Sequence, residues 1–109
     1  MMQDTISKIE SRLQQGALPD HTRAELLSLL AQLKVEVSRL AQTHEEQAQS
    51  IASFTDVSTF EATRTEKNQK SLEHSIGGLE SSVSELEASH PQLVGVVNRL
   101  ANMLSNMGI

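Results

Sequence analysis

The chain has 109 residues, nine Lys and Arg against 14 Asp and Glu, and a formal charge of −5 at neutral pH. It contains no Cys, which excludes disulfides, thiolate metal sites and cysteine nucleophiles. The acidic balance and the lack of Trp and Tyr argue against a nucleic-acid binder, which needs a basic track or stacking platforms. The length fits one small domain, so we expect residues 1–109 to fold as a single unit.

The first predicted helix covers residues 4–15. Ile6, Ile9 and Leu13 recur at spacings of three and four, which places them on one helix face. Gly16 then favours a helix stop, and Pro19 lies in the linker that follows.

The second predicted helix covers residues 21–53. Thr22 to Glu25 has the form of a capping box, in which a hydroxyl and a carboxylate satisfy amides of the first turn. An apolar stripe with coiled-coil-like heptad spacing follows, formed by Leu26, Leu30, Leu33, Val37 and Leu40. The register continues through a half-polar stretch that includes His44, where an isolated polar residue could set register or oligomer state.

A break is predicted at residues 54–58. Residues 50–65 are rich in Ser and Thr, which favour caps and turns, and Ser58 to Glu61 again resembles a capping box. The third predicted helix covers residues 59–88, with Gly77 and Gly78 inside it. Its apolar stripe is Leu72, Ile76, Leu79, Val83 and Leu86.

The fourth predicted helix covers residues 90–107 and has the clearest start signal. We expect Ser89 to cap it, with His90 next, Pro91 in the first turn and Gln92 at the third position. Its stripe is Leu93, Val97, Leu100 and Leu104. Arg99 is the one charged residue of this helix. Because it has so little charge, we expect the helix to pack in a core.

These elements predict an all-α protein of about four helices, either a helical bundle or a helical hairpin with coiled-coil-like stripes. Two arrangements are compatible with the pattern. Residues 21–53 and 59–88 either fold back on each other at the break or continue as one long rod with a phase shift near residue 58. The density of Ser and Thr at the break favours the hairpin.

The last third of the chain resembles a known family. Glu87, the His90–Pro91 pair, Leu93 and the ending Met107-Gly108-Ile109 look like the C-terminal signature of short bacterial helical proteins described only as a domain of unknown function. Leu18-Pro19-Asp20 resembles a helix start in the same family. The chain differs in having Leu86 where Phe is common and in its longer Ser/Thr-rich middle. The resemblance covers about half of the chain and implies a small cytoplasmic helical protein with no assigned activity.

No phosphate-binding glycine loop and no nucleophile elbow occurs, so we predict a non-enzyme without a cofactor. The four His residues (His21, His44, His74 and His90) include no pair at the spacing of a local metal site. We therefore predict no metal, and the alternative is a metal or small-molecule site formed across helices, for example by His44 and His74.

The leading hypothesis for function is a structural or interaction module that self-associates or binds a helical protein, since heptad-like stripes are the main feature. The stripes of residues 26–40 and 72–86 would carry assembly, and the stripe of residues 93–104 would close the core. No signal peptide and no membrane-length apolar run occurs, so we expect a cytoplasmic protein. Peripheral membrane association through residues 90–107 is a further alternative.

Overall fold

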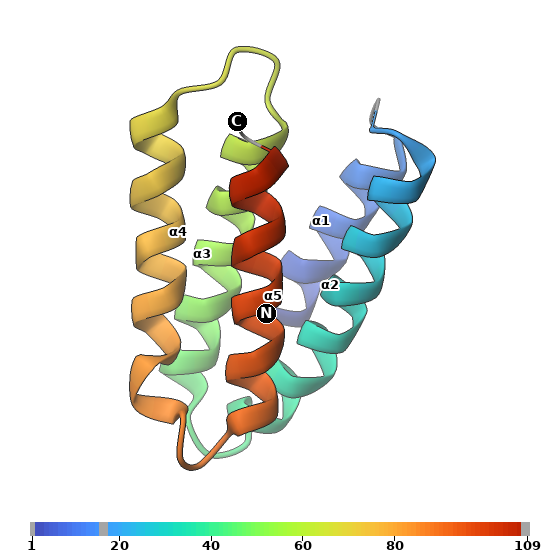
Figure 1. The fold of residues 1–109 in the computed structure, drawn as a ribbon. Helices are drawn as coiled ribbons and strands as arrows, with labels where there is room; N and C mark the ends of the chain where they lie inside the picture. Colours follow the sequence, from blue (N-terminus) through green and yellow to red (C-terminus); the bar gives the residue numbers. More distant parts are fainter. Residues whose placement is uncertain (1, 16–17, 108–109) are drawn as a thin grey trace.

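The computed structural model describes residues 2–15 and 18–107, which form five α-helices and no strand. The helices are α1 (Met2–Gln15), α2 (Asp20–Ala41), α3 (Glu45–Thr63), α4 (Gln69–Val83) and α5 (Pro91–Met107), with a short 3-10 turn, η1 (Ser84–Leu86), after α4. Consecutive helices run in opposite directions (Figure 1). The all-α prediction is confirmed, although one more helix is present than expected. The predicted helix stop at Gly16 lies outside the described residues.

Four of the helices form a closed ring. α2 packs on α3, α3 on α4, α4 on α5, and α5 returns to α2, with a further contact between α3 and α5. α1 lies outside this ring against α2 and α3 (Figure 1). Each helix of the ring thereby covers the apolar face of its neighbours, which single amphipathic helices need for stability.

The core runs along the inside of the ring and into the contact with α1. Ile6 and Ile9 of α1 are fully buried, as are Leu30 of α2 and Leu100 of α5. Burial of each such side chain contributes about 1.5–3 kcal/mol. The apolar spacing read from the sequence therefore identifies the core face of α1, α2, α4 and α5.

The predicted helix over residues 21–53 is wrong, because a turn at residues 42–44 divides it into α2 and α3. The Leu40 carbonyl accepts hydrogen bonds from the amides of Thr43 and His44, which closes α2. Two acidic residues, Glu45 and Glu46, then open α3, where the helix dipole favours negative charge. α2 itself begins at Asp20 with Pro19 before it, so Thr22 lies inside the first turn and does not cap it.

The predicted break at residues 54–58 is also wrong, since these residues lie in the middle of α3. The hydroxyls of Thr55 and Thr63 donate to the carbonyls of Ile51 and Thr59, one turn earlier, both at 2.7 Å. Hydroxyls that bond back to their own helix satisfy themselves without ending it. Ser58, expected as a cap, is fully buried in mid-helix.

The second break falls at residues 64–68, between α3 and α4. Asn68 caps α4, its side-chain oxygen accepting a bond of 3.0 Å from the Ser71 amide. α4 ends at Val83 and not at residue 88, because η1 tightens the chain there. With α3 and α4 packed side by side, the single long rod is excluded.

Candidate functional site

The residues predicted to carry assembly, and those predicted to close the core, lie inside the ring. Each is at most 7% exposed. They are Leu26, Leu30, Leu33, Val37 and Leu40 of α2, Leu72, Ile76, Leu79 and Val83 of α4, Leu86 of η1, and Leu93, Val97, Leu100 and Leu104 of α5. Since they cover one another within one chain, a partner of the folded protein would have to contact other residues.

The predicted cap of the last helix is displaced by one residue. α5 begins at Pro91, and the His90 carbonyl accepts the first bond, 3.2 Å from the Val94 amide. The His90 amide donates to the Leu86 carbonyl at 2.7 Å. Ser89 therefore lies one residue before the cap position, while Pro91 occupies the first helical position, where proline is favoured.

The histidines do not meet as proposed for a metal site. The ring of His44, exposed at the turn between α2 and α3, lies edge-on to that of His90, with centroids 6.2 Å apart. His74 is exposed on α4, and its imidazole does not contact that of His44 or His90. No group of three or more His, Asp or Glu close enough to hold a metal occurs among the described residues. His44 lies exposed in the turn between α2 and α3. It therefore does not occupy a buried position of an apolar stripe, where it was expected to set register or oligomer state.

The apolar stripe of α5, the basis of the membrane alternative, is covered by the neighbouring helices. Its residues are the Leu and Val side chains that fill the ring. Within the described residues, no helix combines the length and hydropathy that a bilayer span requires.

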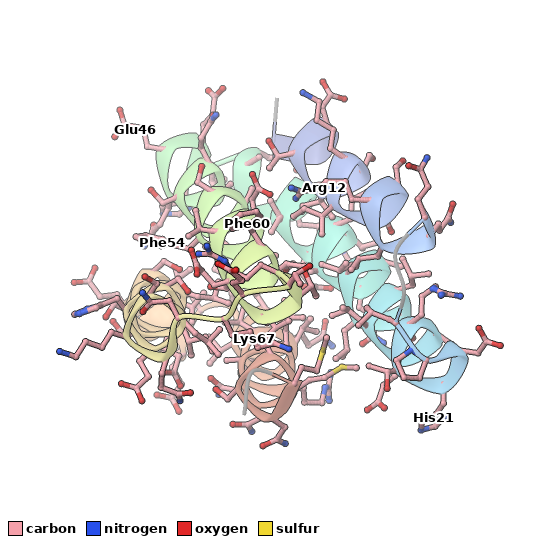
Figure 2. The ribbon with its side chains drawn as sticks, turned by 90° about the horizontal axis from the view of Figure 1, so that it is seen from above. Arg12, His21, Glu46, Phe54, Phe60 and Lys67 are labelled. Carbon is pink, nitrogen blue, oxygen red and sulfur yellow. The ribbon has the colours of Figure 1, made fainter. Side chains whose placement is uncertain are left out.

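Large apolar side chains are exposed instead on α3. Phe54, Val57 and Phe60 are 38%, 47% and 49% exposed, and Phe54 and Phe60 are the two aromatic residues of the chain. Val35 of α2, 51% exposed, lies apart from them on another helix. Figure 2 shows both Phe side chains projecting from α3. Three large apolar residues on one exposed helix face form a patch of the kind that marks interaction sites.

This surface, which we call the α3 outer face, is a line of residues along the solvent side of α3. Between successive members the sequence advances by four or three residues, which keeps them on one side of a helix. Within α3 the line consists of Glu46, Ser50, Ser53, Val57 and Phe60, with Phe54 beside it, and Arg64, the residue that follows the C-terminus of α3, extends it. Sequence reasoning missed it because a turn was expected here.

The opposite, buried face of α3 is made mainly of small residues. Besides Ile51, its buried residues are Ala48, Ala52, Thr55, Ser58, Thr59 and Ala62. Small side chains let α3 approach α1, α2, α4 and α5 closely, while the bulky Phe side chains lie on its outer side. α3 thus reverses the usual order of large inside and small outside.

Polar pairs border the α3 outer face on both sides. Arg12 of α1 pairs with Asp56, and Arg64 pairs with Glu61 at 3.1 Å. The Arg64 guanidinium also lies 5.4 Å from the centroid of the Phe60 ring, in the range of a cation–π contact. Phe60 and Arg64 are thereby held in place.

A groove of about 330 Å³ runs between α1 and α3 beside Phe60. Both apolar and polar side chains line it. Its lining is Ile9, Arg12, Leu13 and Leu18 on one side and Thr59, Phe60, Thr63 and Arg64 on the other. The groove extends the apolar surface of α3 toward α1.

Comparison with protein families gives a match over most of the chain. The model described as Domain of unknown function (DUF4404) matches residues 26–109, which covers most of α2 and all of α3, α4 and α5. α1 lies outside the match. Neither the curated proteins nor the solved structures include a match to this chain.

Proposed function

The chain belongs to the DUF4404 family, a domain of unknown function, and from its structure we propose that it is a non-enzymatic interaction module. In this proposal the bundle is a rigid support, and the α3 outer face binds a helical protein partner. The observation that carries the proposal is the exposure of Phe54, Val57 and Phe60 on one helix. Burial of the exposed part of these side chains by a partner would contribute free energy of binding.

The spacing of the α3 outer face favours a helix as the partner. Residues separated by alternating steps of three and four form a straight ridge that packs into the groove of a second helix. The buried stripes of the bundle have the same spacing, which supports coiled-coil-like packing inside it. Arg64 and Glu46 at the two ends of the face supply polar contacts at its rim, as in other protein interfaces.

Site-specific photo-crosslinking in living cells tests this proposal. A photoreactive residue at position 57 should give a crosslinked product. The same residue at position 35 should not, because Val35 is similarly exposed but isolated on α2. Position 35 is a matched control, since the native residue is Val at both sites. Equal yields from the two positions, or no product from position 57, would refute the proposal.

A further inference from the structure

We propose that the partner of the α3 outer face is a second copy of this chain, with the two α3 helices packed antiparallel about a twofold axis at the level of residue 55 along the helix. This inference rests on the proposed function and specifies its partner. It follows from three properties of the face: its spacing, its end charges and its distribution of large and small side chains.

The spacing of the face reads the same in both directions. From Glu46 to Arg64 the steps are 4, 3, 4, 3 and 4 residues. An antiparallel copy therefore places every member of the line opposite another member. The opposed pairs are Glu46 with Arg64, Ser50 with Phe60, and Ser53 with Val57, each formed twice. A surface that matches itself in this way is what a twofold interface requires.

The charges at the two ends decide the orientation. Glu46 is exposed and has no ion pair within the described residues, and Figure 2 shows it pointing outward from α3. Arg64 at the other end retains a 35% exposed side chain, whereas Lys67 points away from this face toward α5 (Figure 2). Antiparallel packing brings Glu46 to Arg64 at both ends. Parallel packing would place like charges together, which is unfavourable.

Large and small residues also alternate suitably. Phe60 and Val57 are each about half exposed, and in the antiparallel pair each faces a serine of the other copy. A bulky side chain opposite a small one lets two helices interdigitate closely. Phe54, whose ring lies over Gly78 of α4, borders the middle of this interface.

The size of the face predicts a reversible dimer. α3 has 19 residues and is therefore about 28 Å long, and a helix is about 10 Å wide. The area of such a strip, its length times its width, is smaller than the roughly 800 Å² per partner that is buried in stable complexes. We expect dissociation upon dilution.

Sedimentation equilibrium of the full chain, detected by refractive index because Trp and Tyr are absent, tests the proposal. The mass should rise with concentration from 11.9 kDa toward twice that value. Glu46→Lys and Arg64→Glu should each weaken dimerisation at least tenfold, since each creates two like-charge pairs. An equimolar mixture of these two variants should dimerise again, because every opposed pair then joins opposite charges. Val35→Asp, on α2, should leave dimerisation unchanged.

Crosslinking through single introduced cysteines tests the orientation against a background without native Cys. A mixture of the Ser53→Cys and Val57→Cys variants should form a disulfide-linked heterodimer, because these two positions face each other in the antiparallel pair, within the reach of a disulfide. Glu46→Cys by itself should form no linked dimer, since its two copies lie about 27 Å apart in the antiparallel pair. Efficient linkage of Glu46→Cys would overturn the antiparallel arrangement.

A mass of one chain at every concentration would overturn the second-copy proposal. The proposed function would fail separately, if position 57 crosslinks to nothing in cells. A monomer in vitro together with a crosslink to a different protein would refute the dimer and support the interaction module.

Discussion

Two buried serines on neighbouring helices differ in their hydrogen bonding. Ser58 of α3 is fully buried, and its hydroxyl has no partner within the described residues. Ser75 of α4 is 6% exposed and donates to the Leu72 carbonyl at 2.9 Å. A buried polar group without a partner costs about 1–3 kcal/mol, whereas a bonded one does not. The small size of Ser58 suits the close packing of α3, but its hydroxyl does not contribute to stability.

We therefore expect Ser58→Ala to stabilise the protein. Its free energy of unfolding should exceed that of Ser75→Ala by about 1–2 kcal/mol, because only the second change removes a hydrogen bond. Both changes remove one oxygen from a helix and gain similar helix propensity, so Ser75→Ala is a matched control. Urea denaturation followed by circular dichroism measures the difference. A lower stability for Ser58→Ala than for Ser75→Ala would contradict it.

At the scale of elements, the approach of α3 to α4 depends on a glycine. The Phe54 ring lies over Gly78, where an added Cβ would collide with it, whereas nothing lies within 4 Å of a Cβ added at Gly77. Glycine in a helix costs about 1 kcal/mol relative to alanine. Gly78 is thus an unfavourable residue for α4 but a suitable one for its contact with α3.

Alanine at the two positions should separate these effects. Gly77→Ala should raise the free energy of unfolding by about 0.5–1 kcal/mol, through helix propensity alone. Gly78→Ala should gain less, because the Phe54 ring must move further into solvent. Thermal unfolding of both variants measures this difference. In a protein that carries Phe54→Ala, adding Gly78→Ala should give the full gain relative to Phe54→Ala alone. Identical stabilities for Gly77→Ala and Gly78→Ala would show that the packing of Phe54 does not depend on the missing Cβ at Gly78.

The helix ends show where local signals succeed. Pro91 marks the start of α5, at the first helical position, because proline has no amide to leave unsatisfied there. The capping box at Thr22, in contrast, does not mark the start of α2. The Ser and Thr residues of α3 were wrongly predicted to form a break. Their hydroxyls can either accept a hydrogen bond from an amide of the first helical turn, as a cap, or donate one to a carbonyl one turn earlier. That choice depends on which faces neighbouring helices cover.

At the scale of the whole molecule, stability resides in the ring and not in the exposed face. Leu33 of α2 is fully buried, while Val35, two residues away, is 51% exposed. A natural domain is stable by about 5–15 kcal/mol, so the loss of one large core side chain removes a sizeable part of it.

Leu33→Ala should lower the free energy of unfolding by about 2–5 kcal/mol, through lost burial and the cavity left behind. Val35→Ala should change it by no more than about 0.5 kcal/mol. Chemical denaturation of the two variants at one protein concentration gives both values. Similar losses for the two would mean that the faces of α2 are assigned wrongly.

The sequence by itself determined the all-α class, the core residues of α1, α2, α4 and α5, and the absence of cysteine chemistry. Apolar spacing carries this information because a helix must bury one face wherever it packs. Only the tertiary structure decided the turn at residues 42–44, the continuity of α3 through residues 54–58, and the exposure of Phe54, Val57 and Phe60. On α3 the small residues face inward, where α1, α2, α4 and α5 all pack against it. Hydrophobic patterning, which assumes large side chains inside, therefore could not identify the candidate site.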